Sequence, residues 1–368
     1  MKMPVFRGAK RWPLVVAGLF LSSILLAACG ENSPSILNTA GPVAASESGV
    51  FYAILIIATI VFVGVEGVLI YSIFKFRERP GMPAPKQLHG NLQVEIIWTI
   101  APAVILFIVL GFTIRGLFEV ANQPDDPHTV QVEAIGHQWW WEFYYPQYHI
   151  TTADSLVVPA NTVVHVSLYS NNVIHSFWVP ELTGKTDVIP GHTNEKWFKA
   201  DVPNKTYLGI CAEFCGTQHA NMKFNVVVNT SDTFKTWVST QQQVATSGAN
   251  NSLAAQGAQV FANAGCTGCH GIKGVNLNAE DDPKAVCNDP SKACLVGPNL
   301  THFGSRNLIA GGVSENNVNQ CQPGNLKDCN LAKWLHDPQA VKPGNDMAIG
   351  KLTDEQINQL VAYLESLK

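Results

Sequence analysis

The sequence contains few charged residues for its length. Lys, Arg, Asp and Glu make up 14% of 368 residues, against about 25% in an average globular protein. The formal net charge is -4, so there is no basic excess to neutralise phosphate groups, which argues against a nucleic-acid partner. The sequence also shows no internal repeat. The low charge content favours membrane segments, and the length predicts two or three domains.

Histidine is absent from the two long apolar runs, at residues 49–74 and 92–118. Each run exceeds the roughly 20 residues that an α-helix needs to cross a membrane, so we expect a transmembrane hairpin over residues 49–120. The loop between the runs carries four basic residues and one acidic residue: Lys75, Arg77, Arg79, Lys86 and Glu78. By the positive-inside rule this loop is cytoplasmic, and the chain after the hairpin lies on the outer face.

The N-terminus is typical of an exported protein. Basic residues precede an apolar core at residues 14–27, which predicts a signal peptide over residues 1–28. The run ends Leu26-Ala27-Ala28-Cys29, which resembles a bacterial lipobox and implies that Cys29 is lipidated. The alternative is an ordinary cleavage site with an incidental cysteine. In either case we expect residues 29–48 to form a short periplasmic segment, with the thiols of the chain in an oxidising compartment.

Three further regions follow the hairpin. Residues 129–230 contain short β-rich runs separated by Pro, Gly and Asn, which predicts an all-β sandwich or barrel. A polar stretch rich in Gln, Ser, Thr and Asn at residues 239–251 predicts a flexible chain, and we expect the whole linker to span residues 231–251. Residues 252–368 open and close with helical patterns, and Thr353 can cap the closing helix.

The densest group of metal-binding residue types lies in one short segment. It contains Cys211, Glu213, Cys215, His219 and Met222. Two thiolates, an imidazole and a thioether suit a soft transition metal such as copper, and a single-copper site needs only one cysteine. Two bridging thiolates therefore favour a two-copper centre, with His175 as a distant fifth candidate. The alternative is a Cys211–Cys215 disulfide with the other residues incidental.

This pattern resembles subunit II of haem-copper cytochrome c oxidase. Gly136-His137-Gln138-Trp139-Trp140-Trp141 is similar to the aromatic stretch of that family, and residues 185–191 are similar to its next landmark. The resemblance implies a cupredoxin-like, Greek-key fold for residues 129–230. It also implies the copper ligands: bridging Cys211 and Cys215, the side chains of His175, His219 and Met222, and the main-chain carbonyl of Glu213.

The same resemblance implies roles for other residues. Trp139 would mark where electrons enter, the alternative being packing of these tryptophans at the membrane interface. The Glu213 side chain would bind a magnesium ion shared with subunit I. Glu95, at the start of the second apolar run, would guard the entrance of a proton pathway into subunit I, the alternative being a residue that snorkels at the interface. Glu66, inside the first run, is costly in a membrane and is expected to contact another subunit.

Cys266-Thr-Gly-Cys269-His270 is the attachment motif of c-type haem, in which both cysteines bind the haem and the histidine is an axial ligand. A downstream methionine is the expected second axial ligand, and Met347 alone is available in this region. The stretches 297–300 and 342–347 resemble class I cytochromes c, which implies an all-α domain over residues 252–368. A C-x-x-C-H string by itself is also compatible with a redox or zinc motif.

Four cysteines remain in this last region, and four cysteines allow three pairings. Their close spacing favours two disulfides that staple loops, Cys287–Cys294 and Cys321–Cys329. They lie in what resembles an insertion in the cytochrome domain.

We therefore expect the electron-input subunit of a respiratory oxidase in the bacterial cytoplasmic membrane. Electrons from a cytochrome c or another periplasmic donor would pass through haem c and the copper pair to subunit I, which reduces O2 and pumps protons. Because the apolar runs lack histidine, oxygen reduction must occur in that partner. Subunit III is a further expected partner, and a respiratory supercomplex is a candidate one. The competing interpretations are a nitrous oxide or nitric oxide reductase subunit, a quinol oxidase subunit, which lacks these copper ligands, and a copper carrier, which needs no fused cytochrome.

Overall fold

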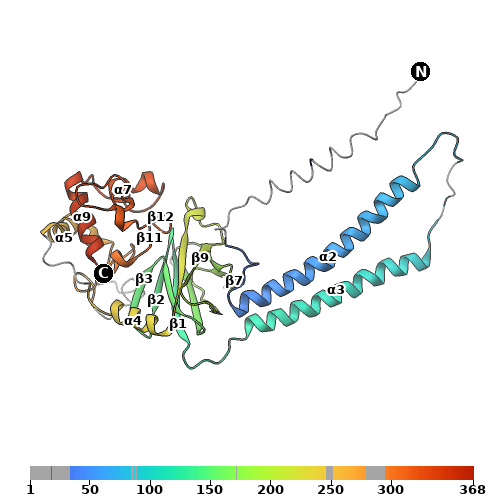
Figure 1. The fold of residues 1–368 in the computed structure, drawn as a ribbon, viewed down its shortest axis with the longest axis horizontal. Coiled ribbons are helices and arrows are strands. Elements are labelled where there is room, and N and C mark those ends of the chain that lie inside the picture. The colour runs from blue at the N-terminus through green and yellow to red at the C-terminus, as the bar shows by residue number, and fades with distance from the viewer. Residues whose placement is uncertain are drawn as a thin grey trace, which may run out of the picture.

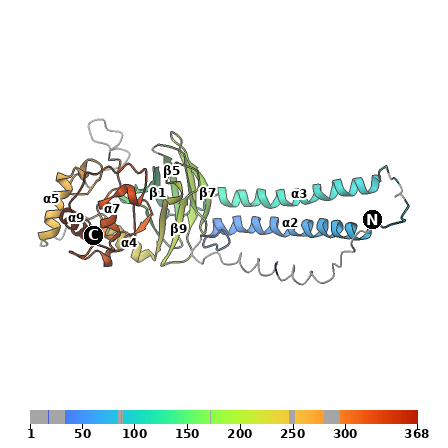
Figure 2. The same cartoon turned by 90° about the horizontal axis from the view of Figure 1, so that it is seen from above.

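A computed structural model describes residues 34–83, 87, 89–170, 172–245, 252–278 and 295–368, together with residue 18. A helical hairpin, a β domain and a C-terminal helical domain lie in a row (Figure 1). Seen from above, the hairpin and the helical domain lie on opposite sides of the β domain (Figure 2). The expected signal peptide and the expected lipidation site Cys29 lie outside the described residues.

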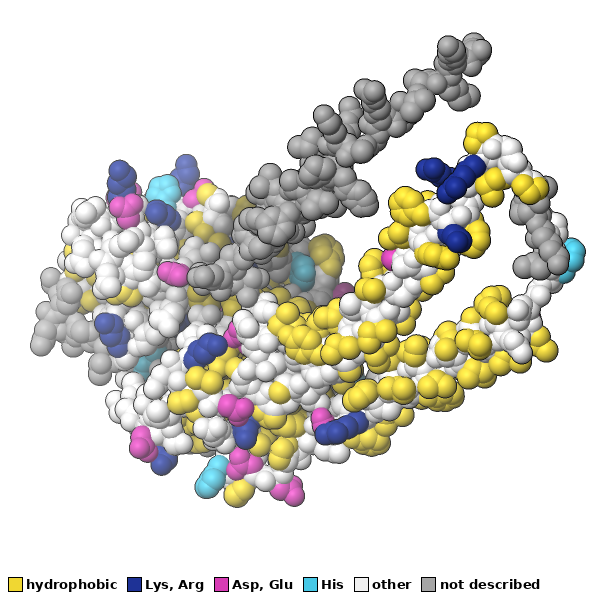
Figure 3. Space-filling view, turned by 45° about the vertical axis from the view of Figure 1, so that its right-hand side comes forward, with side chains coloured by type: hydrophobic (Ala, Val, Ile, Leu, Met, Phe, Trp, Pro, Cys, Tyr) yellow, Lys and Arg dark blue, Asp and Glu magenta, His cyan; other side chains and the backbone are white. Residues whose placement is uncertain are grey.

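The hairpin consists of α2 (Pro42–Lys75) and α3 (Leu92–Ala121). Both helices are long and apolar enough to cross a membrane, and apolar side chains cover their surface (Figure 3). The first helix begins earlier than the expected residue 49, because the fixed φ of Pro42 suits a first helical turn. With 34 residues, α2 is about 51 Å long, and its first turns bury Val43 and Ala44 near the β domain.

Two five-stranded sheets form the β domain, in the orders β3-β2-β1-β5-β8 and β4-β10-β9-β6-β7. The strands of the first sheet are β1 (Val130–His137), β2 (Trp140–Tyr145), β3 (Ile150–Ala153), β5 (Val163–Ser170) and β8 (Asn194–Lys199). Those of the second are β4 (Ser155–Pro159), β6 (His175–Val179), β7 (Thr183–Val188), β9 (Lys205–Cys211) and β10 (Lys223–Asn229). This confirms the predicted all-β, cupredoxin-like domain.

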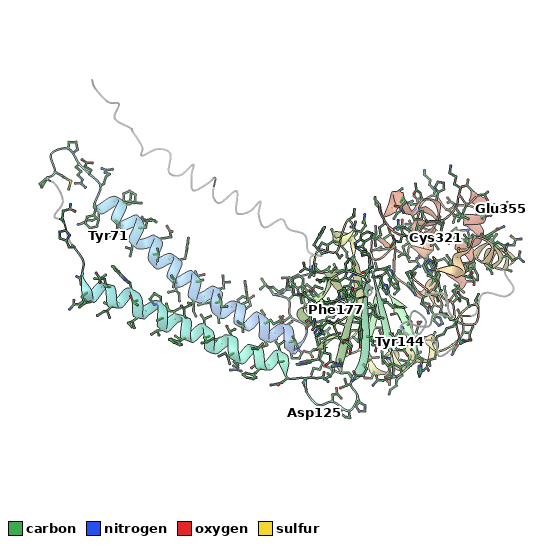
Figure 4. The ribbon with its side chains drawn as sticks, turned by 180° about the vertical axis from the view of Figure 1, so that it is seen from behind. Tyr71, Asp125, Tyr144, Phe177, Cys321 and Glu355 are labelled. Atoms are coloured by element: carbon green, nitrogen blue, oxygen red, sulfur yellow. A yellow bond between two sulfur atoms is a disulfide. The ribbon has the colours of Figure 1, made fainter. Side chains whose placement is uncertain are left out.

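Large aromatic side chains fill the space between the two sheets. Phe177 stacks on Phe224 with ring centroids 4.9 Å apart, and Trp141 packs against both rings. Figure 4 shows Phe177 inside the β domain. Burying a side chain of this size contributes about 1.5–3 kcal/mol to folding. Cys211, Cys215 and Met222 belong to the same core, so the candidate copper ligands rest on a rigid scaffold.

Part of the expected linker is instead a helix. Residues Ser231–Gln241 form α4, capped by the Thr230 side chain, which accepts from the main-chain N–H of Thr233. Phe234 and Trp237 lie on one face of this helix and pack against the β domain. Two aromatic residues three positions apart are neighbours on a helix, and their burial outweighs the polar composition that predicted a flexible chain.

The C-terminal domain contains α5 (Ser252–Asn263), α7 (Asn330–His336), α8 (Pro338–Val341) and α9 (Asp354–Ser366). Short elements join them: η2 (Cys266–Gly268), η3 (Phe303–Ser305), β11 (Leu308–Ile309), β12 (Ser314–Glu315) and η4 (Val318–Gln320). This confirms the predicted helical domain, to which the two-residue ribbon β11–β12 is a small addition. Helix α5 crosses α9 closely, since a Cβ at Gly257 would lie 2.0 Å from the carbonyl oxygen of Gln359.

Two local predictions for this domain are confirmed. Thr353 caps α9, and Gln356 completes a capping box. Cys321 and Cys329 form a disulfide, and Figure 4 labels Cys321 in this domain. The predicted partners Cys287 and Cys294 lie outside the described residues, so that pairing stays a prediction.

Candidate metal centre and haem site

Three neighbouring strands bring the candidate copper ligands together. His175 opens β6 and Cys211 ends β9, while Met222 directly precedes β10. These strands are adjacent in the order β10-β9-β6. Cys215 lies in the loop after β9, and His219 begins the short helix η1 (His219–Asn221). The distant histidine therefore reaches the cysteine loop because sheet pairing bridges the separation along the chain.

The donor atoms of these residues already converge. The two Sγ atoms of Cys211 and Cys215 lie 3.8 Å apart. Cys211 Sγ lies 3.9 Å from His175 Nδ1, and Cys215 Sγ lies 3.7 Å from His219 Nδ1 and 3.8 Å from Met222 Sδ. Both cysteines are free and buried. A disulfide needs a sulfur–sulfur distance near 2.05 Å, so the structure does not contain the alternative Cys211–Cys215 bridge.

The chemistry of this donor set fits copper. Two sulfur atoms that can each bridge two ions, two ring nitrogens and a thioether form a soft, buried cluster. The carbonyl oxygen of Glu213 lies 3.3 Å from Cys211 Sγ, close enough to join the set. Hydrogen bonding with Cys215 lowers the pKa of the Cys211 thiol, and the same contact raises that of Cys215. A cation can bind both sulfur atoms only as it displaces the proton that remains on Cys215, because thiolates are the metal ligands.

Neighbouring groups fix the His175 ring. Its Nε2 donates to Asn172 Oδ1 at 3.0 Å, which leaves the Nδ1 lone pair facing Cys211. The main chain at Gly136 lies against the ring, since a Cβ there would be 2.7 Å from His175 Cδ2. Trp141 packs against the ring in a T-shaped arrangement. Asn172 and Gly136 are supporting residues to which the sequence reasoning gave no role.

The three consecutive tryptophans face in different directions. The indole N–H of Trp139 donates to the Cys215 carbonyl at 2.9 Å, beside a bond from Gln138 Nε2 to the same oxygen. Trp140 stacks on His137 with ring centroids 4.2 Å apart, and Trp141 lies in the core. Of the three tryptophans, Trp139 therefore bonds to the copper loop, and its main-chain carbonyl accepts from Lys342 of the C-terminal domain.

The haem residues surround a cavity in the C-terminal domain. Cys266, His270 and Met347 line a space of about 320 Å³ whose remaining walls are mainly apolar, within the usual range for ligand sites. Cys269 is exposed near this cavity. His270 Nδ1 lies 2.8 Å from the Pro298 carbonyl, which can only accept, so this nitrogen donates and Nε2 is left free to bind iron. The cavity and its donors fit a covalently attached haem.

Gly297 allows the main chain to lie close to the other side of the His270 ring. A Cβ at Gly297 would lie 2.7 Å from His270 Cε1. Burial is the main cause that lowers the pKa of His270, which favours the neutral ring that a metal needs. The Gly297-Pro298 turn therefore both places the histidine and selects its tautomer.

Two acidic site predictions have different surroundings. Glu95 lies in the first turn of α3, where its Oε1 accepts from the Asn91 N–H at 3.3 Å. A carboxylate at this position also stabilises the positive end of the helix dipole, so Glu95 has a local structural role as well. Glu213 presents its carbonyl to Cys211, and its side chain is partly exposed.

Sequence comparisons agree with this geometry. The family model described as "Cytochrome C oxidase subunit II, transmembrane domain" matches residues 35–115, and "Cytochrome C oxidase subunit II, periplasmic domain" matches residues 148–231. The model "Cytochrome c" matches residues 254–368. Cytochrome c oxidase subunit 2 of Alkalihalophilus pseudofirmus is 35% identical over 100% of this chain and 99% of its own length. The chain belongs to the cytochrome c oxidase subunit II family.

Further relatives have the same family description. Cytochrome c oxidase subunit 2 of Bacillus sp. strain PS3 is 35% identical over 98% of this chain and 99% of its own length. A crystal structure of the periplasmic domain of subunit II of cytochrome oxidase of Bradyrhizobium japonicum is 32% identical. It covers 32% of this chain and 96% of its own, with a TM-score of 0.31. Membership of the family makes this chain a membrane-bound part of a haem-copper oxidase that works with a subunit I, and its two soluble domains imply haem c and a copper centre.

Proposed function

We propose that this subunit is the electron input of its oxidase. It accepts electrons from a cytochrome c-type donor on the outer face of the bacterial cytoplasmic membrane. They pass through the haem c and the dinuclear copper centre of the chain to subunit I, where O2 is reduced to water and protons are pumped. The observation that carries this proposal is the buried convergence of His175, Cys211 and Cys215, whose ligand atoms all lie within 4.8 Å of one another.

The ligand assignment follows from this cluster. The side chains of Cys211, Cys215, His175, His219 and Met222 would hold the two coppers, with both cysteines shared between them, and the Glu213 carbonyl would bind alongside. When bound, the copper pair and the haem iron each accept and release one electron. The chain holds their ligands nearly still: His175 is anchored by Asn172, and the Cys215 loop is anchored by Gln138 and Trp139. Fixed ligands lower the reorganisation that accompanies each electron transfer.

Membrane orientation supports the same proposal. Lys75 ends α2, and Arg77 and Arg79 follow it in the loop of the hairpin; such an excess of basic residues favours the cytoplasmic side. Both soluble domains then lie on the outer face, where a cytochrome c or another periplasmic donor can reach them. Subunit III and a respiratory supercomplex are further partners of this proposal.

Two acidic residues and one tryptophan have proposed roles. Trp139 carries electrons toward the copper loop, Glu213 supplies its carboxylate to a magnesium ion shared with subunit I, and Glu95 guards a proton pathway into that subunit. Replacing Glu95 with Ala in the assembled oxidase is expected to slow turnover and proton uptake together. Unchanged turnover and uptake would remove the proton role and leave only the helix-capping role seen here.

Metal analysis and spectroscopy on the purified full-length chain test the copper and haem assignments. We expect two coppers and one haem c per chain, a mixed-valence copper signal in electron paramagnetic resonance and a low-spin haem spectrum. His175→Ala is expected to lose the copper signal, whereas His128→Ala, at an exposed histidine, keeps it. A single copper per chain would refute the proposed centre. Nitric oxide reduction by the assembled complex, in place of oxygen uptake with reduced cytochrome c, would favour the rival reductase.

A further inference from the structure

A buried lysine joins the cytochrome domain (residues 252–368) to the copper domain (residues 129–230). Lys342, directly after α8, is only 3% exposed. Its Nζ donates to the Trp139 carbonyl at 2.6 Å and to the Ala310 carbonyl at 2.8 Å. One carbonyl belongs to each domain, so a single ammonium group bridges them.

Other buried polar contacts hold the same interface. Gln218 Nε2, in the copper loop, donates to the Pro343 carbonyl at 2.7 Å. A second buried amine, Lys273, donates to the His149 carbonyl at 2.8 Å. Trp139 directly precedes strand β2, and His149 ends the turn between β2 and β3, so the two lysines bind the chain before and after β2. The cytochrome domain therefore packs against the copper domain through buried hydrogen bonds and is not joined to it by the linker alone.

The charge of Lys342 has a nearby counter-charge. Burial lowers the pKa of Lys342 to about 8, and the carboxylate of Asp154 opposes that shift. Asp154 is 4% exposed and belongs to the copper domain. A buried ammonium group near a carboxylate and bonded to two carbonyls is costly to leave without those partners. Separation of the domains would remove one of the carbonyls and the carboxylate together.

Lys342 also lies between the ligands of the two redox groups. On one side, the Trp139 carbonyl that it holds belongs to the residue whose indole donates to Cys215. On the other side, Asn345 donates to the Lys342 carbonyl at 2.7 Å and accepts from the Met347 N–H at 2.8 Å. A continuous path of hydrogen bonds and covalent bonds therefore joins the proposed copper ligand Cys215 to the proposed haem ligand Met347.

We propose that Lys342 is a positioning residue for electron transfer within this chain, because its ammonium group locks the cytochrome domain onto the main chain of Trp139. This inference rests on the proposed function. The step that it serves moves one electron from ferrous haem iron to the oxidised copper pair, so iron is oxidised and copper is reduced. No bond forms or breaks in this step, and no proton moves.

Hydrogen–deuterium exchange on the full-length chain with its cofactors bound tests the lock. The Lys223 N–H donates across the interface to the Gly311 carbonyl at 3.3 Å, so its exchange reports domain separation. Lys342→Met keeps much of the aliphatic chain but removes the charge and the donors. We expect exchange at Lys223 to accelerate about 10- to 100-fold, the effect of losing a charged hydrogen bond. Lys333→Met, at an exposed lysine, should leave it unchanged.

A second pair of variants tests the same contact without removing the charge of Lys342. A Cβ at Gly311 would lie 2.3 Å from both Lys342 Nζ and the Trp139 carbonyl oxygen, and Gly311 has φ +68°. Gly324 has φ +80°, but no described atom lies within 4 Å of its Cβ position. Gly311→Ala and Gly324→Ala therefore carry similar backbone strain, and only Gly311→Ala should accelerate exchange at Lys223.

Cofactor-loaded protein supplies the functional readout. After flash reduction of the haem, we expect Lys342→Met and Gly311→Ala to slow haem-to-copper transfer about tenfold or more, as expected when partners are misplaced by about 1 Å. Lys342→Met should also lower the copper reduction potential, because it removes a positive charge that acts on Cys215. Gly311→Ala should leave the potential unchanged.

Wild-type exchange at Lys223 and wild-type transfer rates in both variants would overturn the lock and leave the proposed function standing. Absence of haem-to-copper transfer in the wild-type chain would instead refute the proposed function itself, and the lock with it.

Discussion

The copper centre and the haem site differ in how much of each the polypeptide forms by itself. Around the two cysteines of the copper loop, sulfur and nitrogen donors already lie 3.7–3.9 Å apart within a closed core. The haem residues instead line a cavity of about 320 Å³. The copper ligands lie in a domain whose core is already packed, whereas the haem site is a cavity that the cofactor must fill.

The same difference appears in the two hydrophobic cores. The copper-domain core consists of aromatic and β-branched residues between two sheets. Several core residues of the cytochrome domain also line its cavity: Phe261, Leu300, Phe303, Leu331, Leu335, Leu360 and Leu364. Haem is therefore part of the packing of the cytochrome domain, whereas copper adds ligand bonds to a domain that is already packed. Removing each cofactor should separate these two cases.

The largest effect is expected from preventing haem attachment. In Cys266→Ala/Cys269→Ala no haem is attached, and the mainly apolar side chains that line the cavity of about 320 Å³ are left without the group that would pack against them. Calorimetry should therefore lose the cooperative transition of the cytochrome domain and keep that of the copper domain.

The matched variant removes the copper thiolates. Cys211→Ala/Cys215→Ala is expected to abolish copper binding and electron transfer while both domains still unfold cooperatively. The comparison between the two sites would be wrong if the haem-free domain kept a sharp transition, or if the copper-free domain lost its own.

A smaller change should lower the copper content of the site without removing any ligand. In Gly136→Ala the new methyl group would lie 2.7 Å from His175 Cδ2, so the ring must move away from the thiolates. We expect the copper content to fall by half or more while haem attachment stays complete. Metal analysis and the haem spectrum measure the two outcomes.

Gly67→Ala serves as the control, because no described atom lies within 4 Å of its added Cβ. Normal copper loading in Gly136→Ala would show that the His175 ring can shift without loss of the centre. The scaffold would then be softer than the geometry indicates.

Sequence reasoning identified the motifs whose residues lie close together along the chain because they bind the same cofactor. Cys266, Cys269 and His270 must be close in sequence because one haem binds all three. Cys211, Cys215, His219 and Met222 are likewise confined to one short loop. His175 lies 36 positions before Cys211; the sequence offered it as a distant fifth candidate, and the family resemblance implied that it is a ligand. Strand pairing between β6 and β9 explains why that distance along the chain disappears in space.

Other features have no local signature. Helix α4 was hidden by a polar composition, although Phe234 and Trp237 are spaced for one helical face. Lys342 looks like an ordinary surface lysine in the sequence, and only the docking of two domains buries it. The ribbon β11–β12 depends on Gly311 and Gly312, both with positive φ, and its packing against Lys223 also comes from the other domain. The contacts between the two domains therefore could not be predicted from the sequence.

The smallest expected effect compares one helix cap from each domain. Thr353 caps α9, which packs against α5 in the cytochrome core, and Thr230 caps α4 at the edge of the copper domain. Loss of a threonine cap costs about 1 kcal/mol of helix stability.

For Thr353→Ala we expect the full cost in the unfolding transition of the cytochrome domain, a decrease in Tm of about 4 °C. For Thr230→Ala we expect less, because α4 can fray while both sheets stay paired, and Thr→Ser at either position should retain the cap. Equal decreases in the two calorimetric transitions would show that α4 unfolds together with the sandwich, and the copper scaffold would then extend through the segment that joins it to the cytochrome domain.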